Sequence, residues 1–194
     1  MINYPNGKSS SYKPKVKTAH KPVKSGNRGM GLEDDINDSN LFYKEKDLCL
    51  ITKRPTPINV VKVDYSHGAI ITNAYFEKQS TTDYNGVYKG RYIDFEAKST
   101  HSKTSLPLSN IPSQQIEHLK GVIRHGGIAF FIIEFALKEE TYLLDAQYVI
   151  DLVNEGKRQS LSYDYIKTNG REIKRGYHPR LDYLPIVEEL YFKN

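Results

Sequence analysis

The stretch TTDYNGVYKGRYIDFEAK, residues 81–98, predicts a β-hairpin that organises the rest of the chain. Lys89 and Gly90 can form its two-residue turn, because glycine readily adopts the positive φ that such a turn requires. Each step away from this turn pairs one residue of the first strand with one of the second. Asp83 is therefore expected to face Glu96 across the hairpin, with their Cβ atoms about 5 Å apart.

The same register pairs Thr81 with Lys98. Because successive side chains of a strand point to opposite faces, these two residues share one face with Asp83 and Glu96. The opposite face of the second strand is apolar and is expected to point towards a core; it holds Ile93, Phe95 and Ala97.

A competing turn at Asn85-Gly86 would give a different hairpin. Asn-Gly is the stronger turn signal by composition. It would pair Asp83 with Tyr88, however, and would leave no opposed carboxylates. The residues alone keep both turns open.

Two carboxylates that face each other repel, so their pairing needs a compensating partner. A divalent cation such as Mg²⁺ would supply it, because this ion binds through one or two carboxylates together with phosphate oxygens and water. A lysine two residues beyond Glu96 would stabilise negative charge on a phosphate. We interpret Asp83, Glu96 and Lys98 as a phosphodiester-cleaving site. The alternative is a solvated strand face with an ion pair, which Glu-x-Lys alone would favour.

The positive charge of the chain is concentrated at its beginning. The net charge is +5, and residues 1–28 carry seven Lys and Arg and no acidic residue, so the remainder is slightly negative. This segment is rich in Ser, Lys, Pro and Gly and has few large aliphatic residues, a composition typical of a disordered arm. A basic arm predicts a polyanionic partner; a solubilising tail is the other interpretation.

The remaining composition bounds the class of protein. We expect residues 29–194 to form one domain with its own core. Cys49 is the single cysteine, so no internal disulfide can form, which fits a reducing, cytoplasmic compartment. The His residues lack metal-ligand spacing, so no zinc site is predicted. No apolar run approaches a membrane span, and residues 1–30 lack the apolar core of a signal peptide.

Periodicity beyond the arm predicts an α/β domain with a mixed sheet flanked by helices. One helix is expected to begin near residue 32, and three more are expected over residues 111–125, 145–153 and 183–192. The expected strands are 48–51 as a short buried strand, 58–63 and 69–76 as a hairpin, 128–133 as a central strand covered on both faces, and 141–144. Residues 53–57 and the polar segment 99–110 are expected to be irregular.

Two further polar positions near this site stay open. Gln115 and His118 lie three residues apart near the start of a predicted helix, on one side of it. They either approach the metal and the scissile phosphate or face solvent. Glu33 either faces the site or simply suits the start of a helix, and the helix dipole favours the second interpretation.

Several segments together resemble one protein family. They are Asn27-Arg28-Gly29-Met30, Leu32-Glu33-Asp34-Asp35, residues 53–57, Ala74-Tyr75-Phe76, the long block 80–98, residues 115–118 and residues 189–192. On these motifs the chain resembles RecU, the Holliday junction resolvase family of Gram-positive bacteria. The resemblance covers almost the whole chain and is weakest over residues 145–174.

The resemblance implies a restriction-endonuclease-like fold and a homodimer that acts on four-way DNA junctions in recombination and repair. It implies Mg²⁺ or Mn²⁺ as the cofactor, held by Thr81, Asp83, Glu96 and Gln115. It assigns the stabilisation of the transition state to Lys98. Gln115 comes from the family alone, whereas the hairpin register selects the other four residues independently.

The resemblance also implies a protruding stalk at about residues 58–77, where pattern alone favours an ordinary sheet hairpin. Family membership further implies contacts with the RecA recombinase and the branch-migration helicase complex. The residues that we expect to contact DNA lie on the arm and on the stalk; they are Lys13, Lys15, Lys17, Arg28, Lys62, Tyr75 and Phe76.

Two other functions are kept open at this point. One is a duplex endonuclease of the same superfamily, such as a restriction or repair enzyme. The other is a non-catalytic module that binds branched DNA and regulates recombination. The intact Asp83, Glu96 and Lys98 argue against the second, because a protein that only binds DNA has no need of opposed carboxylates beside phosphate.

Overall fold

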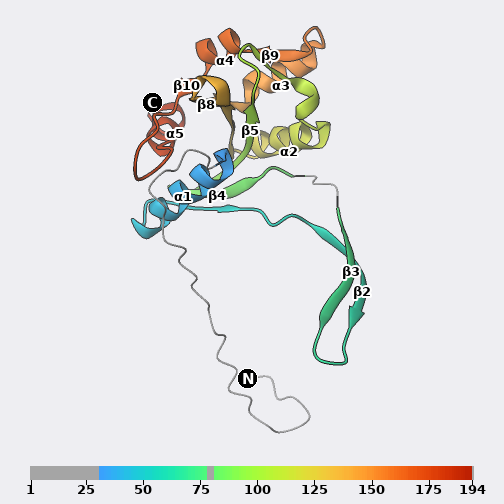
Figure 1. Cartoon of the computed structure of the whole chain (residues 1–194). Coiled ribbons are helices and arrows are strands. Elements are labelled where there is room, and N and C mark those ends of the chain that lie inside the picture. Colours follow the sequence, from blue (N-terminus) through green and yellow to red (C-terminus); the bar gives the residue numbers. More distant parts are fainter. Residues whose placement is uncertain (1–30, 78–80, 194) are drawn as a thin grey trace.

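The computed structural model describes residues 31–77 and 81–193. Within them, six strands form one sheet in the order β1-β4-β5-β7-β8-β10, and helices lie on both of its faces (Figure 1). The strands β5 and β7 run parallel and the other neighbours run antiparallel, so the sheet is mixed, as predicted. The predicted arm, with Lys13, Lys15, Lys17 and Arg28, lies outside the described residues.

The elements follow one another along the chain in an α/β order. The strands of the main sheet are β1 Leu50–Lys53, β4 Tyr84–Tyr88, β5 Arg91–Thr100, β7 Ile128–Phe135, β8 Glu140–Asp145 and β10 Arg171–Glu172. The helices are α1 Leu32–Glu45, α2 Ser113–Arg124, α3 Ala146–Glu155, α4 Tyr163–Asn169 and α5 Leu184–Tyr191. Short strands β6 Ser105–Pro107 and β9 Ser160–Ser162 pair with each other.

The core forms two layers, one on each face of the sheet. Helices α1 and α5 cover one face, where they contact Ile93 and Phe95 of β5. Helices α2, α3 and α4 cover the other face, where they contact Phe131 and Ile133 of β7. Every residue of β7 is buried, which confirms the prediction of a central strand covered on both sides.

The hairpin of β4 and β5 closes at the predicted turn. Lys89 and Gly90 have φ of 47° and 77°, as a primed two-residue turn requires. The ladder pairs Tyr88 with Arg91 and continues to Tyr84 and Phe95, which is the register that the Lys89-Gly90 turn predicts. The competing turn is wrong, because residues 85–86 lie inside β4.

Three sequence predictions differ from the structure. The strand at 48–51 was expected to be buried, but β1 is an edge strand in which only Ile51 is buried, because one of its faces has no cover. Leu50 is 54% exposed. The segment 99–110 contains β6 and a 3-10 turn, and the short helix α4 was not predicted.

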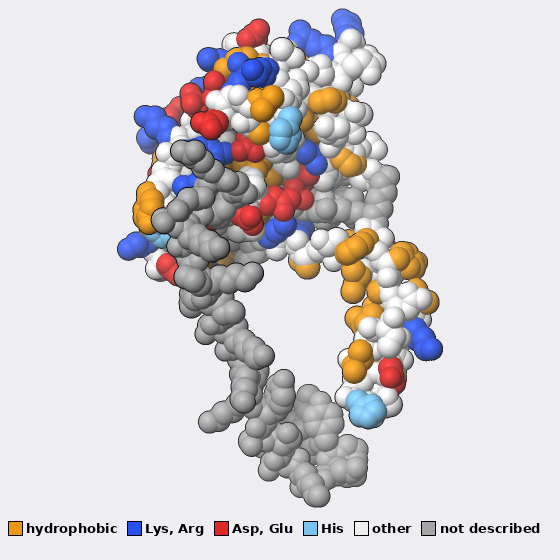
Figure 2. Space-filling model, in the orientation of Figure 1, with side chains coloured by type: hydrophobic (Ala, Val, Ile, Leu, Met, Phe, Trp, Pro, Cys, Tyr) orange, Lys and Arg blue, Asp and Glu red, His pale blue; other side chains and the backbone are white. Residues whose placement is uncertain are grey.

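The predicted stalk stands apart from the domain. The strands β2 Ile58–Asp64 and β3 Ile70–Phe76 pair only with each other and extend away from the main sheet (Figure 1). All of β3 is exposed, and Figure 2 shows the stalk with apolar side chains along its surface. This arrangement agrees with the family resemblance and not with an ordinary sheet hairpin. None of the helices in the described part of the chain is long and apolar enough to cross a membrane.

Replacing Gly86 with alanine should destabilise the fold. An added Cβ would lie 2.0 Å from the Leu50 carbonyl oxygen and 2.6 Å from the Ile51 Cα, and these backbone atoms can move away only if β1 separates from β4. We expect a loss of about 2–3 kcal/mol in the free energy of unfolding, measured by urea denaturation.

Gly121→Ala in α2 is the matched control, since its Cβ would meet only the end of the Arg124 side chain at 4.0 Å. Alanine favours a helix more than glycine does, so this variant should be as stable as the wild-type protein or more so. Equal stability of Gly86→Ala and the wild-type protein would contradict the close β1–β4 contact.

Candidate active site

The two predicted carboxylates meet at the open end of the β4–β5 hairpin. The β4 ladder begins at Tyr84, so Asp83 lies just outside it and reaches β5 through hydrogen bonds instead. The Asp83 N–H donates to Glu96 Oε2 at 3.1 Å, and the Ala97 N–H donates to Asp83 Oδ2 at 3.2 Å. The hairpin thus brings both acidic side chains to one place, as the register predicts.

Burial and the second carboxylate make the ionised form of Glu96 costly. Its side chain is 1% exposed. Burial in the first place, and the negative charge of Asp83 in the second, raise the pKa of Glu96 from 4.5 to about 7. Lys98 offsets part of this effect, because its Nζ lies 2.6 Å from Glu96 Oε1. A further positive charge near the pair would stabilise both carboxylates.

Gln115 reaches from α2 to the backbone of Thr81, two residues before Asp83. Its side chain is buried, and its Nε2 donates to the Thr81 carbonyl oxygen at 3.4 Å. Its Oε1 is buried too and has no hydrogen-bond partner in the structure as described. A buried carbonyl oxygen without a donor is costly and implies a partner that the protein itself does not supply.

These groups fit a hard divalent cation. The donors are the two carboxylates, the Gln115 Oε1 and the Thr81 carbonyl oxygen, and Mg²⁺ prefers oxygen ligands of these kinds. Nowhere in residues 31–77 and 81–193 do three or more His, Cys, Asp or Glu gather as a metal cluster. A site with only two carboxylates still fits Mg²⁺, because this ion commonly binds through one or two carboxylates and keeps several waters.

Of the other residues predicted near this site, some lie where the sequence placed them and some do not. Lys98 shares the face of Glu96, as expected. The β4–β5 ladder does not extend to Thr81, so its predicted pairing with Lys98 is wrong, and Thr81 lies against Gln115 instead. Glu33 lies in the first turn of α1 and pairs with Lys53, whose pKa is raised mainly by Glu33 and to a lesser extent by the charge of Asp83, so both interpretations of Glu33 stay open.

Sequence reasoning missed a second charged cluster beside the carboxylates. Asp94, two residues before Glu96 and on the same face, is fully buried and is bound by Arg54, which lies 2.6 Å away. Tyr92 donates to Asp94 from the same strand at 2.8 Å, and His118 Nε2 lies 2.9 Å from it. Once the pairing of β1 with β4 is known, Arg54 falls opposite Asp83, but this pairing joins strands that are not consecutive.

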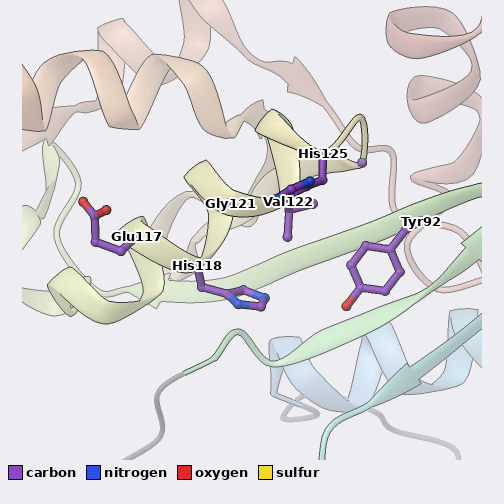
Figure 3. A pocket seen from close by; sticks show the side chains of 7 residues that line it. Tyr92, Glu117, His118, Gly121, Val122 and His125 are labelled. Atoms are coloured by element: carbon purple, nitrogen blue, oxygen red, sulfur yellow. The ribbon is translucent and has the colours of Figure 1, made fainter.

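His118 also opens onto the surface of the protein. The side chains of His118, from α2, and Tyr92, from β5, line one groove, and Figure 3 shows how they lie. The volume of this groove is about 400 Å³. The groove continues along α2; its other lining residues are Glu117, Gly121, Val122, His125 and Gly127. The Asp94 cluster thus lies between this groove and the carboxylate pair.

A sequence model of the family described as Recombination protein U, RecU, matches residues 27–189. The chain belongs to the RecU family. This membership confirms the resemblance that the motifs indicated.

Individual relatives match the chain over nearly its whole length. It is 49% identical over 198 residues to the Holliday junction resolvase RecU of Bacillus cytotoxicus, with 98% of each chain covered. It is 47% identical over 199 residues to that of Bacillus cereus, with the same coverage. Among solved structures, it is similar to Hjc, a Holliday junction resolvase of Archaeoglobus fulgidus, with 12% identity, a TM-score of 0.41, and 71% of this chain and 93% of Hjc covered.

Two of the predicted DNA-contacting residues of this RecU-family chain lie at the root of the stalk, where Phe76 pairs with Ile58 and Tyr75 pairs with Asn59. Tyr75 is 60% exposed and Phe76 is 78% exposed, both on β3, and Lys62 of β2 is exposed as well. The two aromatic residues belong to a larger exposed apolar surface of the stalk, which also includes Ile58, Val60, Val61, Ile70 and Ile71. The two roots of the stalk come together, since the Glu77 N–H donates to the Pro57 carbonyl oxygen.

The raised pKa of Glu96 predicts how the stability of the metal-free protein depends on pH. A carboxyl whose pKa is higher in the folded chain binds its proton more tightly there, so its contribution to stability is lost as pH rises from 4.5 to about 7. Glu96→Gln removes this loss. The free energy of unfolding of Glu96→Gln relative to wild type should therefore increase across this window, by on the order of 2–3 kcal/mol.

Chemical denaturation at a series of pH values in EDTA measures this difference. Glu117→Gln is the control, because its side chain is 69% exposed and lies outside the carboxylate pair. Added Mg²⁺ should stabilise the wild-type protein more as pH rises, and it should stabilise Glu96→Gln little. A difference between Glu96→Gln and wild type that does not change with pH would contradict the raised pKa.

Proposed function

We propose that this RecU-family chain is a structure-selective endodeoxyribonuclease that resolves Holliday junctions by paired, symmetric nicks. The observation that carries the proposal is the contact of Asp83 with Glu96, with Lys98 beside them on one face of the hairpin. Relatives of nearly the same length are named Holliday junction resolvases. A module that only binds branched DNA would not need opposed carboxylates at a phosphate site.

The proposed cofactor is Mg²⁺ or Mn²⁺. Asp83, Glu96 and the Gln115 Oε1 would hold the ion together with the Thr81 carbonyl oxygen, and the unpaired Gln115 oxygen supports this assignment. When bound, such an ion polarises a phosphate and lowers the pKa of a nearby water.

The side chains of the site have distinct tasks in hydrolysis. Asp83 and Glu96 provide the negative charge that selects a cation. Lys98 keeps its ammonium group at the carboxylates, where it can neutralise charge that develops on the phosphate oxygens or orient the attacking water. The burial of Glu96 places its carboxylate in surroundings of low polarity, which strengthens its interactions with Lys98 and with a bound cation. The expected products are a 5′-phosphate and a 3′-hydroxyl.

A homodimer would match the symmetry of the substrate. A four-way junction presents two equivalent strands, and a two-fold dimer would present two equivalent sites. The dimer, the contacts with RecA and with the branch-migration helicase complex, and a cytoplasmic, nucleoid-associated location remain part of this proposal. The dimer and the protein contacts rest on the family resemblance. The location rests on the single cysteine of the chain, which fits a reducing compartment.

The stalk is the part of the protein that could distinguish a junction from a duplex. Phosphates look alike in both, so the basic arm and Lys62 can position DNA but cannot select its shape. A junction has an open centre where stacked bases end. Tyr75 and Phe76 are exposed enough to stack on such bases, and each stacked ring contributes roughly 1–3 kcal/mol.

Removing either carboxylate should abolish cleavage and spare binding. Asp83→Ala and Glu96→Ala should cut synthetic four-way junctions at background rate, while junction affinity stays the same or rises, since an acidic group next to phosphate is lost. Lys98→Ala should lower turnover by about 10²–10³-fold with little change in affinity.

Single-turnover cleavage and gel-shift assays measure these two properties separately. Glu189→Ala, at an exposed surface ion pair, is the control and should cut at the wild-type rate. A carboxylate variant that still cuts at a near-normal rate would show that the site lies elsewhere. Cleavage of linear duplex as efficient as that of the junction would favour a duplex endonuclease.

Shortening the stalk between Val60 and Thr72 should remove junction selectivity. Because β2 and β3 pair only with each other, the main sheet and the carboxylate pair should stay folded. The shortened protein should bind duplex weakly but lose its preference for junctions and its paired nicking. Phe76→Ala should show a milder defect of the same kind.

Competition binding between junction and duplex DNA measures this selectivity. Tyr177→Ala is the matched control, because this aromatic residue is 93% exposed but lies outside the stalk. Full selectivity in the shortened protein would move recognition of the junction from the stalk to another surface.

A further inference from the structure

The segment that carries Asp83 is not held by the regular sheet. The β4–β5 ladder stops at Tyr84, and so does the β1–β4 ladder, which ends with Lys53 opposite Tyr84. A metal ligand must nevertheless keep a fixed position if the cation is to bind tightly. Other contacts therefore have to fix Thr82 and Asp83.

Arg54 makes these contacts with both its backbone and its side chain. Its N–H donates to the Asp83 carbonyl oxygen at 2.7 Å, which continues the β1–β4 pairing by one residue. Its Nη1 donates to the Thr82 carbonyl oxygen at 3.2 Å and to the Thr82 Oγ1 at 2.6 Å. A single arginine thus binds the carbonyl oxygens of the two peptide groups that flank the Asp83 Cα.

The carboxylate of Asp94 binds the guanidinium group of Arg54 through two hydrogen bonds. Its Oδ2 lies 2.6 Å from Arg54 Nη2 and its Oδ1 lies 3.4 Å from Arg54 Nη1. Thr82 Oγ1 hydrogen-bonds to the same Oδ1, and Tyr92 and His118 contact Oδ2. A carboxylate offers about four lone-pair sites, and five groups surround this one.

Because its oxygens are already occupied, Asp94 has a different role from Glu96, the next acidic residue on the same face of β5. Asp94 has no lone pair left for a cation, so it is not an alternative metal ligand to Glu96. Its charge is instead compensated by Arg54, which is 17% exposed and forms a planar, two-pronged contact. The compensated pair adds no net charge beside the carboxylates, and the positive guanidinium does not repel a cation there.

We propose that Arg54 is a positioning residue that fixes the metal ligand Asp83, and that Asp94 is its anchor. The inference deepens the proposed nuclease function, since it concerns the same cation site. Groups that orient metal ligands typically contribute 10–100-fold to metal affinity. Arg54 lies on the chain that enters the stalk and Thr82 on the chain that returns from it, so sequence distance hides their contact.

The test compares Arg54→Ala, Arg54→Lys and Asp94→Asn in the absence of DNA. Isothermal titration with Mn²⁺ gives the affinity of the cation site, and hydrogen exchange of the Ala97 amide reports on Asp83, whose carboxylate accepts from that amide. Arg54→Ala should bind Mn²⁺ at least 10-fold more weakly and exchange the Ala97 amide at least 10-fold faster. Arg54→Lys should be intermediate, because lysine keeps the positive charge but lacks the planar set of N–H donors of the guanidinium group. Asp94→Asn should resemble Arg54→Ala.

Arg91→Ala is the matched control on the same hairpin. Arg91 also donates to backbone carbonyl oxygens, those of Tyr191 and Gly126, but at the turn end of β5. It should leave Mn²⁺ affinity and Ala97 exchange unchanged whatever it does to the melting temperature. If Arg54→Ala and Arg54→Lys only lower the melting temperature and keep both properties, Arg54 is structural and the proposal is overturned.

The proposed nuclease function can fail separately. Failure of the wild-type protein to cut junctions, with the expected changes in Mn²⁺ affinity and Ala97 exchange, would overturn the activity and leave the role of Arg54 standing. Failure of the wild-type protein to bind Mn²⁺ would overturn both.

Discussion

The repulsion between Asp83 and Glu96 is the constraint on which the rest of the site depends. The hairpin places one carboxylate against another and buries Glu96, and both effects raise the pKa of Glu96 to about 7. The free energy that this arrangement costs is offset by the packing of the opposite face of β5, where Ile93, Phe95 and Ala97 lie in the core layer beneath α1 and α5. Lys98 compensates one charge, and the oxygen donors that remain, including the unpaired Gln115 Oε1, favour a divalent cation.

The stalk and the carboxylate pair share one base. Arg54 precedes β2, Asp83 follows β3, and the bonds of Arg54 to Thr82 and Asp83 join the two chains at that point. The hydrogen bond between Glu77 and Pro57 joins the same two chains again where the stalk begins. The element that we propose to recognise the junction is thus rooted directly beside the residues that we propose to cut it.

Local rules made the hairpin predictable and left its surroundings open. The register of β4 and β5 follows from one turn and from side-chain alternation, so Asp83, Glu96 and Lys98 could be placed from the sequence. Arg54 could not, because its partner strand lies beyond the whole stalk and no turn fixes the pairing of β1 with β4. The same distance made residues 48–51 look buried, since nothing in the sequence marks β1 as an edge. Helix α4 was missed because only Ile166 of its seven residues is buried, which leaves no apolar periodicity.

The central claim is that the hairpin builds one cation site. A crystal structure of the protein grown with Mn²⁺, with anomalous diffraction data, tests it most directly. We predict an anomalous peak between Asp83 and Glu96, with the Gln115 Oε1 and the Thr81 carbonyl oxygen among its ligands and Asp94 still bound to Arg54. A well-ordered peak on Asp94, or none at the carboxylate pair in a protein that cuts junctions with Mn²⁺, would contradict the account.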